Sequence, residues 1–162
     1  MKNRAYKNYI FDFYGTLVDI LTDEKDPVLW DKLAQLYQAY GADYKGEGLK
    51  KSYAKRVTQA RKELIELKGV AYPEIDLAHI FNQLYVDARP QSSSSNQPED
   101  WGQLIAMVFR VLSRKHVTAY PHTKEVLAFL KEQGCRIYLL SNAQAAFTNA
   151  EIDLMELSPY FD

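Results

Sequence analysis

The stretch YIFDFYGTLVDI, residues 9–20, decides the fold of this chain. It opens with a run of large apolar side chains that is too short for a helix and is closed by Gly15, so it predicts a buried β-strand over residues 8–13. Asp12 then lies at the carboxyl end of that strand, next to a tight turn that contains Gly15 and Thr16. Ligands of open α/β sheets bind at this end of the strands, so Asp12 is a candidate for chemistry.

A second apolar run near the end of the sequence has the same organisation. The segment CRIYLLSNA, residues 135–143, predicts another buried strand. Its polar residues, Ser141 and Asn142, come where that strand ends. Pro121 suits the start and Gly134 the end of a helix directly before it.

Between the two strands the apolar residues recur at the spacing of amphipathic helices. A polar connection, RPQSSSSNQPED at residues 89–100, interrupts them. The order of elements predicts an α/β core over residues 1–20 and 116–162 with an inserted all-helical cap over residues 21–115. The helices are expected over residues 27–41, 48–68, 77–85 and 101–112. Aromatic residues on their apolar stripes favour core packing, namely Trp30, Tyr37, Tyr40, Tyr53, Tyr85 and Trp101.

The composition is that of a soluble globular protein. Of 162 residues, 47% are hydrophobic and 25% are charged, and the formal net charge is -1. These values argue against global disorder and against general binding of nucleic acid. No apolar run approaches the length of a membrane helix, and the N-terminal segment lacks a secretory cleavage site. We therefore expect no membrane partner and a cytoplasmic location.

A carboxylate at a strand end can act as a covalent nucleophile when neighbouring donors hold its target. Thr16 and the backbone N–H groups of the turn supply such donors, and Ser141 and Asn142 add more from the second strand. Each of these features alone is also typical of an ordinary turn. Their order along the chain, an acid with Gly-Thr after one strand and Ser-Asn after another, indicates an active site.

The segment FDFYGTLVD, residues 11–19, resembles the first motif of the haloacid dehalogenase (HAD) superfamily, and YLLSNA, residues 138–143, is similar to its second. The helical segment between them is similar to the cap that many members insert. This resemblance implies a Rossmann-like core, a covalent intermediate on Asp12, and a substrate oxyanion held by Ser141 with Asn142 beside it. For phosphatase members it also implies Mg²⁺, bound partly by Asp12 and by the backbone carbonyl of Tyr14.

Tyr14 departs from the phosphatase pattern, which usually has a second Asp there to protonate the leaving group. A tyrosine, with an ordinary pKa of about 10, could donate a proton but would be a poor base near neutrality. Acid-x-Tyr-Gly-Thr is similar to the dehalogenase branch, in which the halide leaves without a proton. That branch uses an arginine soon afterwards, yet residues 15–55 contain none, and Lys25 or Lys32 would be a less directional replacement. An aromatic wall under the cap is the other role open to Tyr14.

The last residues, MELSPYFD, resemble the segment before the third strand of the family. The lysine of the third motif and the acids of the fourth do not follow. We therefore expect either a fragment of a longer protein or an incomplete sheet whose open edge another chain covers, with self-association as the simplest form. The missing lysine matters for a phosphate substrate, because bringing Asp12 to about 4 Å from one negative charge costs about 4 kcal/mol at an effective dielectric of about 20.

The sequence thus predicts a HAD-type hydrolase with a small-molecule substrate. Asp12 is the expected nucleophile, and Tyr14, Thr16, Ser141 and Asn142 complete the predicted site. A small phosphorylated metabolite is the favoured substrate class, by analogy with the commonest members of the family. An (S)-2-haloacid dehalogenase and a catalytically silent truncated fragment are the two alternatives.

Overall fold

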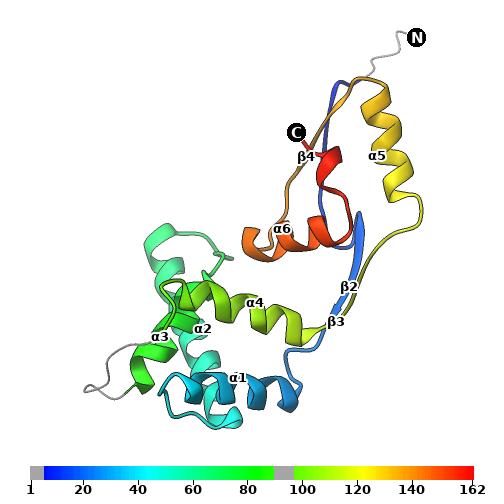
Figure 1. Cartoon of the computed structure of the whole chain (residues 1–162). Coiled ribbons are helices and arrows are strands. Elements are labelled where there is room, and N and C mark those ends of the chain that lie inside the picture. The colour runs from blue at the N-terminus through cyan, green and yellow to red at the C-terminus, as the bar shows by residue number, and fades with distance from the viewer. Residues whose placement is uncertain (1–5, 90–96) are drawn as a thin grey trace. The chain divides into compact units, whose positions relative to one another are not determined.

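A computed structural model describes residues 6–89 and 97–162. The chain is a mixed α/β protein, which confirms the predicted fold class (Figure 1). Most of the polar connection predicted at residues 89–100 lies outside the described residues. In chain order the elements are β1 Asn8–Phe11, β2 Val18–Thr22, α1 Pro27–Ala39, α2 Gly46–Lys68, α3 Leu77–Ala88, α4 Trp101–Ser113, β3 Arg114–Ala119, α5 Thr123–Glu132, β4 Arg136–Leu139, α6 Ala145–Leu154 and the 3₁₀ helix η1 Ser158–Tyr160.

The chain divides into two compact units. Unit 1 consists of Met1–Thr22 and Arg114–Asp162, and it holds every strand found in the described residues. Unit 2 is Asp23–Ser113, and its described elements are the helices α1 to α4. That unit 2 serves as a cap over the active site stays a prediction.

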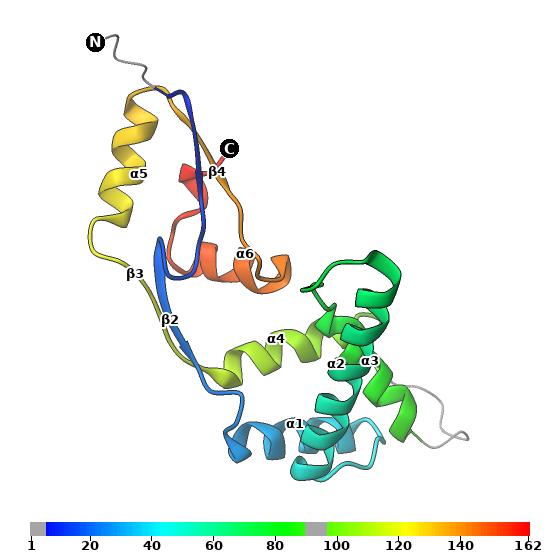
Figure 2. The same cartoon turned by 180° about the vertical axis from the view of Figure 1, so that it is seen from behind.

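The strands of unit 1 form two separate pairs. β1 lies parallel to β4, with Asn8 opposite Arg136 and Phe11 opposite Leu139. β2 lies antiparallel to β3 and forms with it a ribbon that can be followed from behind in Figure 2. The sequence analysis missed this ribbon, because β3 has the sequence RKHVTA and stays largely exposed, so it lacks the apolar run by which a buried strand is recognised.

The core of unit 1 surrounds the turn that follows β1. Phe13 and Val18 are completely buried, and so are Leu127 of α5 and Ile137 of β4. Because these residues come from segments far apart in the sequence, their burial ties the turn, helix α5 and strand β4 into one body. The full cluster of buried residues is Phe13, Leu17, Val18, Leu127, Leu130, Ile137 and Leu157.

Unit 2 has an aromatic core. Tyr37 donates its hydroxyl proton to the carbonyl of Phe81 at 2.7 Å, and Tyr85 donates to the carbonyl of Tyr40 at 2.9 Å. These bonds satisfy the polar ends of two rings inside an apolar core. Burial raises the pKa of Tyr37 well above its usual range. The predicted core packing is confirmed for the rings that are at most 2% exposed, namely Trp30, Tyr37, Tyr85 and Trp101.

The ends of the helices follow local sequence signals. α1 begins at Pro27, as predicted, and the side chain of Asp26 accepts a hydrogen bond from the N–H of Val28 at 2.9 Å. α2 ends at Gly69, whose φ of 65° is left-handed and therefore favours glycine. None of the helices in the described residues combines the length and the apolar character that a membrane span needs.

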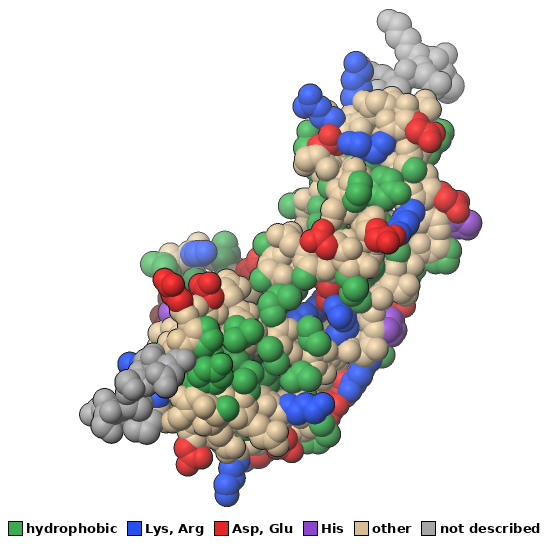
Figure 3. Space-filling view, in the orientation of Figure 1, with side chains coloured by type: hydrophobic (Ala, Val, Ile, Leu, Met, Phe, Trp, Pro, Cys, Tyr) green, Lys and Arg blue, Asp and Glu red, His purple; other side chains and the backbone are tan. Residues whose placement is uncertain are grey.

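Some large apolar side chains of unit 1 stay at the surface. Ile10 on β1 is 66% exposed, and Leu140 after β4 is 70% exposed. In the upper part of the face shown in Figure 3, hydrophobic side chains lie between charged ones, and in its lower part they gather into a larger patch. Within the described residues β1 pairs only with β4. Coverage of an open sheet edge by a second copy therefore stays a prediction.

Helices α3 and α4 approach each other closely at Gly102. A Cβ atom at this position would lie 2.1 Å from the carbonyl oxygen of Ala78, so an alanine requires the two backbones to separate. We expect Gly102→Ala to destabilise unit 2 by about 1–3 kcal/mol, measured as a lower midpoint of thermal unfolding. Gly48→Ala in α2 is the matched control, because its Cβ meets nothing within 4 Å and alanine is the better helix former. A similar fall of the unfolding midpoint in both variants would contradict the close approach of α3 and α4 at Gly102.

Asp162 is tied to β4. The N–H of Asp162 donates to the carbonyl of Ile137 at 2.9 Å, and the N–H of Ile137 donates to the Asp162 carboxylate at 2.8 Å. The ammonium group of Lys131 lies 2.9 Å from the same carboxylate. The pKa of the Asp162 carboxyl lies below its usual range. The hydrogen bond from the N–H of Ile137 is the largest cause, and the hydrogen bond from Lys131 is the next.

This depressed pKa predicts how stability depends on pH. An acid whose pKa is lower in the folded state stabilises the fold above its unfolded-state pKa of about 4, and this contribution is lost as the pH falls through the folded-state value. We expect Asp162→Asn to lower the unfolding midpoint at pH 7, with a difference from wild type that shrinks below about pH 4. Glu132→Gln, an exposed acid beside Lys131, is the control. A difference that stays constant across the pH series would refute the assignment.

Candidate active site

The carboxyl ends of β1 and β4 lie at the same edge of unit 1. The two strands are parallel, with Phe11 opposite Leu139, and the N–H of Leu140 donates to the carbonyl of Phe11 at 2.8 Å. Asp12 follows β1 directly, and Ser141 comes two residues after β4. The two motifs, far apart in the sequence, therefore leave the sheet at one edge, where ligands of parallel sheets bind.

The turn after β1 is closed by the carbonyl of Phe13. This oxygen accepts hydrogen bonds from the N–H groups of Leu17 at 2.9 Å and Val18 at 3.0 Å. Gly15 has a φ of 78°, a left-handed conformation that glycine adopts without steric cost. Because the Phe13 ring is completely buried, the turn is anchored in the core while Asp12 stays exposed.

Asp12 and Thr16 are joined across this turn. The Thr16 hydroxyl donates to Oδ2 of Asp12 at 3.4 Å, and both residues are exposed. This distance is longer than the usual range of about 2.5–3.0 Å for such bonds, so Thr16 orients the carboxylate only loosely. The Asp12 carboxylate therefore remains accessible to a substrate that approaches from solvent.

Ser141 and Asn142 lie at the same edge, but no hydrogen bond among the described residues joins either of them to Asp12. The Ser141 oxygen accepts from the N–H of Ala143 at 3.2 Å, a local contact within the turn. This contact leaves the hydroxyl proton of Ser141 available for an oxyanion. Asn142 is exposed. The structure thus brings the predicted residues to one edge, and their catalytic roles stay predictions.

Tyr14 has a partner that the sequence analysis did not find. Its hydroxyl donates to Oε2 of Glu151 on α6 at 2.5 Å, and Oε1 of Glu151 accepts from Nη1 of Arg114 at 2.9 Å. Glu151 is only 1% exposed. Burial of a carboxylate is costly unless it is paired and hydrogen-bonded, and here a guanidinium and a phenol meet that need. The Tyr14 ring also packs edge-on against Phe13, with 4.8 Å between ring centroids.

The sequence does contain a signal for Glu151. Phe147 and Thr148 form the buried face of α6, and Glu151 stands one turn further along the same face. A charged residue on a buried helix face is almost never left unpaired, so a partner could have been expected. Helical periodicity does not reveal which residue that partner is. Arg114 was harder to find, because it begins the strand that the sequence analysis missed.

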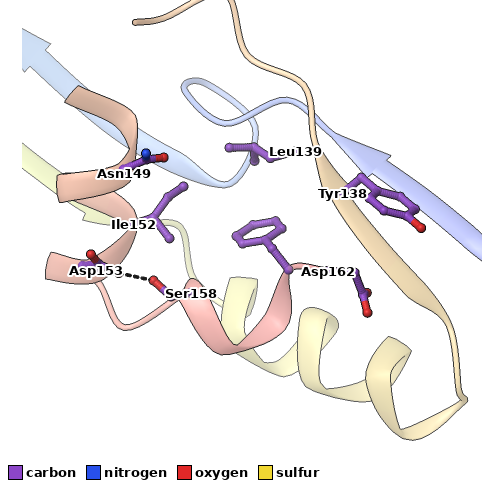
Figure 4. A pocket seen from close by; sticks show the side chains of 8 residues that line it. Tyr138, Leu139, Asn149, Ile152, Asp153, Ser158 and Asp162 are labelled. Atoms are coloured by element: carbon purple, nitrogen blue, oxygen red, sulfur yellow. Dashed lines mark hydrogen bonds between the residues drawn. The ribbon is translucent and has the colours of Figure 1, made fainter. Parts of the chain in front are cut away.

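A pocket of about 590 Å³ is lined by residues of β4, of α6 and of the segment that follows α6. Figure 4 shows Tyr138 and Leu139 from β4 on one side of it, and Asp153 hydrogen-bonded to Ser158 on the other. None of the predicted site residues is among those that line it. The candidate active site is assigned instead to the edge that carries Asp12, because the parallel pairing of β1 with β4 makes Asp12 and Ser141 leave the sheet there.

The predicted magnesium ligands of this chain make up only part of a coordination shell. Mg²⁺ prefers six oxygen ligands, which usually include one or two carboxylates. Asp12 and the backbone carbonyl of Tyr14 are the predicted ligands, and the nearby carboxylate of Glu151 is engaged by Arg114. No group of three or more His, Cys, Asp or Glu side chains suited to a metal occurs in residues 6–89 and 97–162. Mg²⁺ binding stays a prediction.

Comparison with known proteins identifies the family. The sequence model of the haloacid dehalogenase-like hydrolases matches residues 6–162. Among solved structures, the L-2-haloacid dehalogenase of Xanthobacter autotrophicus is 19% identical with a TM-score of 0.39, and the match covers 98% of this chain and 55% of that one. A predicted phosphoglycolate phosphatase of Haemophilus somnus is 17% identical with a TM-score of 0.41, with coverages of 97% and 60%. No curated protein matches the chain.

The chain spans less than two thirds of the length of either of these structures. Their TM-scores are below 0.5, so the assignment depends on the family model, which covers nearly the whole chain. The first and second motifs lie within the residues that it matches. This chain belongs to the haloacid dehalogenase-like hydrolases.

Proposed function

We propose that this chain carries the nucleophile of a hydrolase that forms a covalent acyl phosphate on Asp12, with a small phosphorylated metabolite as the substrate. The observation that carries the proposal is the parallel register of β1 with β4, since it brings Asp12 and Ser141 to one edge of the sheet. A phosphate ester is the first candidate because phosphatases are the commonest members of the family, which is an argument from analogy.

The proposed reaction has two steps. In the first, an oxygen of Asp12 bonds to phosphorus while the bond to the leaving oxygen breaks, and that oxygen keeps the electron pair and takes a proton from solvent. In the second, water attacks phosphorus, the bond to Asp12 breaks, and the carboxylate and inorganic phosphate are released. Thr16 orients the carboxylate, and Ser141 and Asn142 donate hydrogen bonds to the phosphate oxygens.

Electrostatic repulsion is the main obstacle to phosphate as a substrate. Each negative charge held about 4 Å from Asp12 costs about 4 kcal/mol at an effective dielectric of about 20. Neutral donors such as the Ser141 hydroxyl offset only part of this cost. A cation next to the phosphate would offset more, so the phosphatase hypothesis predicts activity that rises with added Mg²⁺.

The second candidate is a 2-haloacid dehalogenase, and Tyr14 is the observation that favours it. Tyr14 occupies the position of the usual second acid, and it is hydrogen-bonded to Glu151. A halide needs no proton to leave. In this reaction an oxygen of Asp12 bonds to the carbon that carries the halogen, the halide departs with the electron pair, and water then cleaves the ester to give a 2-hydroxy acid. The lack of any arginine in residues 15–55 weighs against this candidate.

The two candidates are separated by measuring which ion is released. We expect release of phosphate from phosphorylated metabolites or 4-nitrophenyl phosphate, greater with Mg²⁺, and no release of chloride from 2-chloropropionate. Asp12→Asn should lower the rate at least about 10³-fold, because it removes the nucleophile. Asp19→Asn is the matched control in the same unit, since Asp19 pairs with His116 on the β2–β3 ribbon. Its rate should stay close to that of wild type.

The other outcomes each select another hypothesis. Release of chloride without phosphate, independent of metal, would support the dehalogenase. If this chain releases neither ion but a version extended beyond Asp162 does, the chain is a catalytically silent fragment of the enzyme. Equal losses in Asp12→Asn and Asp19→Asn would reject Asp12 as the nucleophile.

A further inference from the structure

A partly buried hydrogen-bonded chain links Tyr14, Glu151 and Arg114 within unit 1. The Glu151 carboxylate accepts from the Tyr14 hydroxyl with one oxygen and from the Arg114 guanidinium with the other. The side chain of Glu151 is 2% exposed and that of Arg114 is 21% exposed. The three residues come from the turn after β1, from α6 and from the start of β3.

Stability alone is a weak explanation for this arrangement. Taking the Glu151 carboxylate out of water is costly, its Arg114 partner is partly desolvated as well, and well-packed apolar residues of similar size often serve as well as or better than a buried ion pair. The position in which this ion pair holds a neighbouring side chain is therefore a better explanation for it than stability. Here it holds Tyr14, which lies two residues after the proposed nucleophile and in the same turn.

The direction of the hydrogen bond limits what Tyr14 can do. A phenol has one proton, and the Tyr14 hydroxyl donates it to Glu151. Toward a substrate at the Asp12 edge the phenol oxygen can then only accept a hydrogen bond. The edge contact with Phe13, whose ring is completely buried, holds the Tyr14 ring from another side.

We propose that Glu151 is a positioning residue, which acts through Tyr14 by fixing its ring and by withholding the phenol proton from the leaving group. This inference depends on the proposed function and narrows its substrate class. The preferred substrates have leaving groups that depart without a proton, such as acyl phosphates, phosphates of acidic phenols, or halides. Alkyl phosphates, whose leaving alkoxide is strongly basic, are turned over slowly.

A series of aryl phosphates tests the role of the Tyr14 proton. We expect log(kcat/KM) for wild type to fall steeply as the pKa of the leaving phenol rises. Tyr14→Phe should keep the same slope and lose less than about tenfold for every member of the series. If Tyr14 is instead a general acid, the loss should grow with the basicity of the leaving phenol to about 10²–10⁴-fold, and this result would overturn the proposal. Tyr9→Phe, a half-buried tyrosine of β1 packed against the same core, is the matched control.

A second variant tests Glu151 itself. Glu151→Leu combined with Arg114→Met removes both charges together, so that no unpaired ion is left in the core. In this variant the Tyr14 hydroxyl no longer donates to Glu151, so its proton can be donated to a leaving group. We therefore expect the rate for phenyl phosphate to rise at least about tenfold relative to that for 4-nitrophenyl phosphate. A merely structural role for Glu151 leaves this ratio unchanged, and an unchanged ratio would overturn the proposal. If the variant fails to fold, the Tyr14→Phe series still decides.

Thermal unfolding separates this inference from the proposed function. Tyr14→Phe should lower the unfolding midpoint more than Tyr9→Phe does, and it should have no effect in the Glu151→Leu, Arg114→Met background. If wild type hydrolyses none of the substrates, the proposed function fails, while these midpoints still test the link between Tyr14 and Glu151. Equal midpoints for Tyr14→Phe and Tyr9→Phe would refute that link even in an active enzyme.

Discussion

The parallel pairing of β1 with β4 is the constraint on which the rest of unit 1 depends. Ile137 is completely buried in the middle of β4, opposite Tyr9 of β1. Because side chains alternate between the faces of a strand, a shift of one residue would turn Ile137 out of the core. Burial therefore fixes the register, and the register fixes which residues leave the sheet together. Asp12 and Ser141 share an edge for a reason that has nothing to do with catalysis.

The turn after β1 combines two requirements in few residues. Phe13 fills the core and closes the turn with its carbonyl, while Asp12 before it stays exposed. The Tyr14 hydroxyl then bonds to the buried carboxylate of Glu151, which is itself paired with Arg114, so the same turn is also held from the inside. A nucleophile works best when its backbone is held rigidly and its side chain is accessible. The turn meets both conditions, which is the physical basis for placing the candidate active site there.

Unit 2 has its own core, and the packing of that core accounts for its fold without reference to the candidate active site. Its buried aromatic rings come from α1, α3 and α4, and hydrogen bonds to backbone carbonyls satisfy the phenols among them. The close approach of α3 and α4 at Gly102 shows that these helices are tightly matched. A unit of this kind can be inserted between β2 and β3 of another unit, because its packing is satisfied within its own residues.

The sequence by itself determined the features that depend on near neighbours. The apolar run before Asp12, the stripes of the helices, the cap at Asp26 and the end at Gly69 all follow from spacing and turn chemistry within a few residues. Only the tertiary structure decided which remote groups meet. The β2–β3 ribbon needed a partner strand to form, and Glu151 meets Tyr14 across 137 residues of sequence. Local periodicity shows which face is buried, but the partner of a buried charge is set by how distant segments pack.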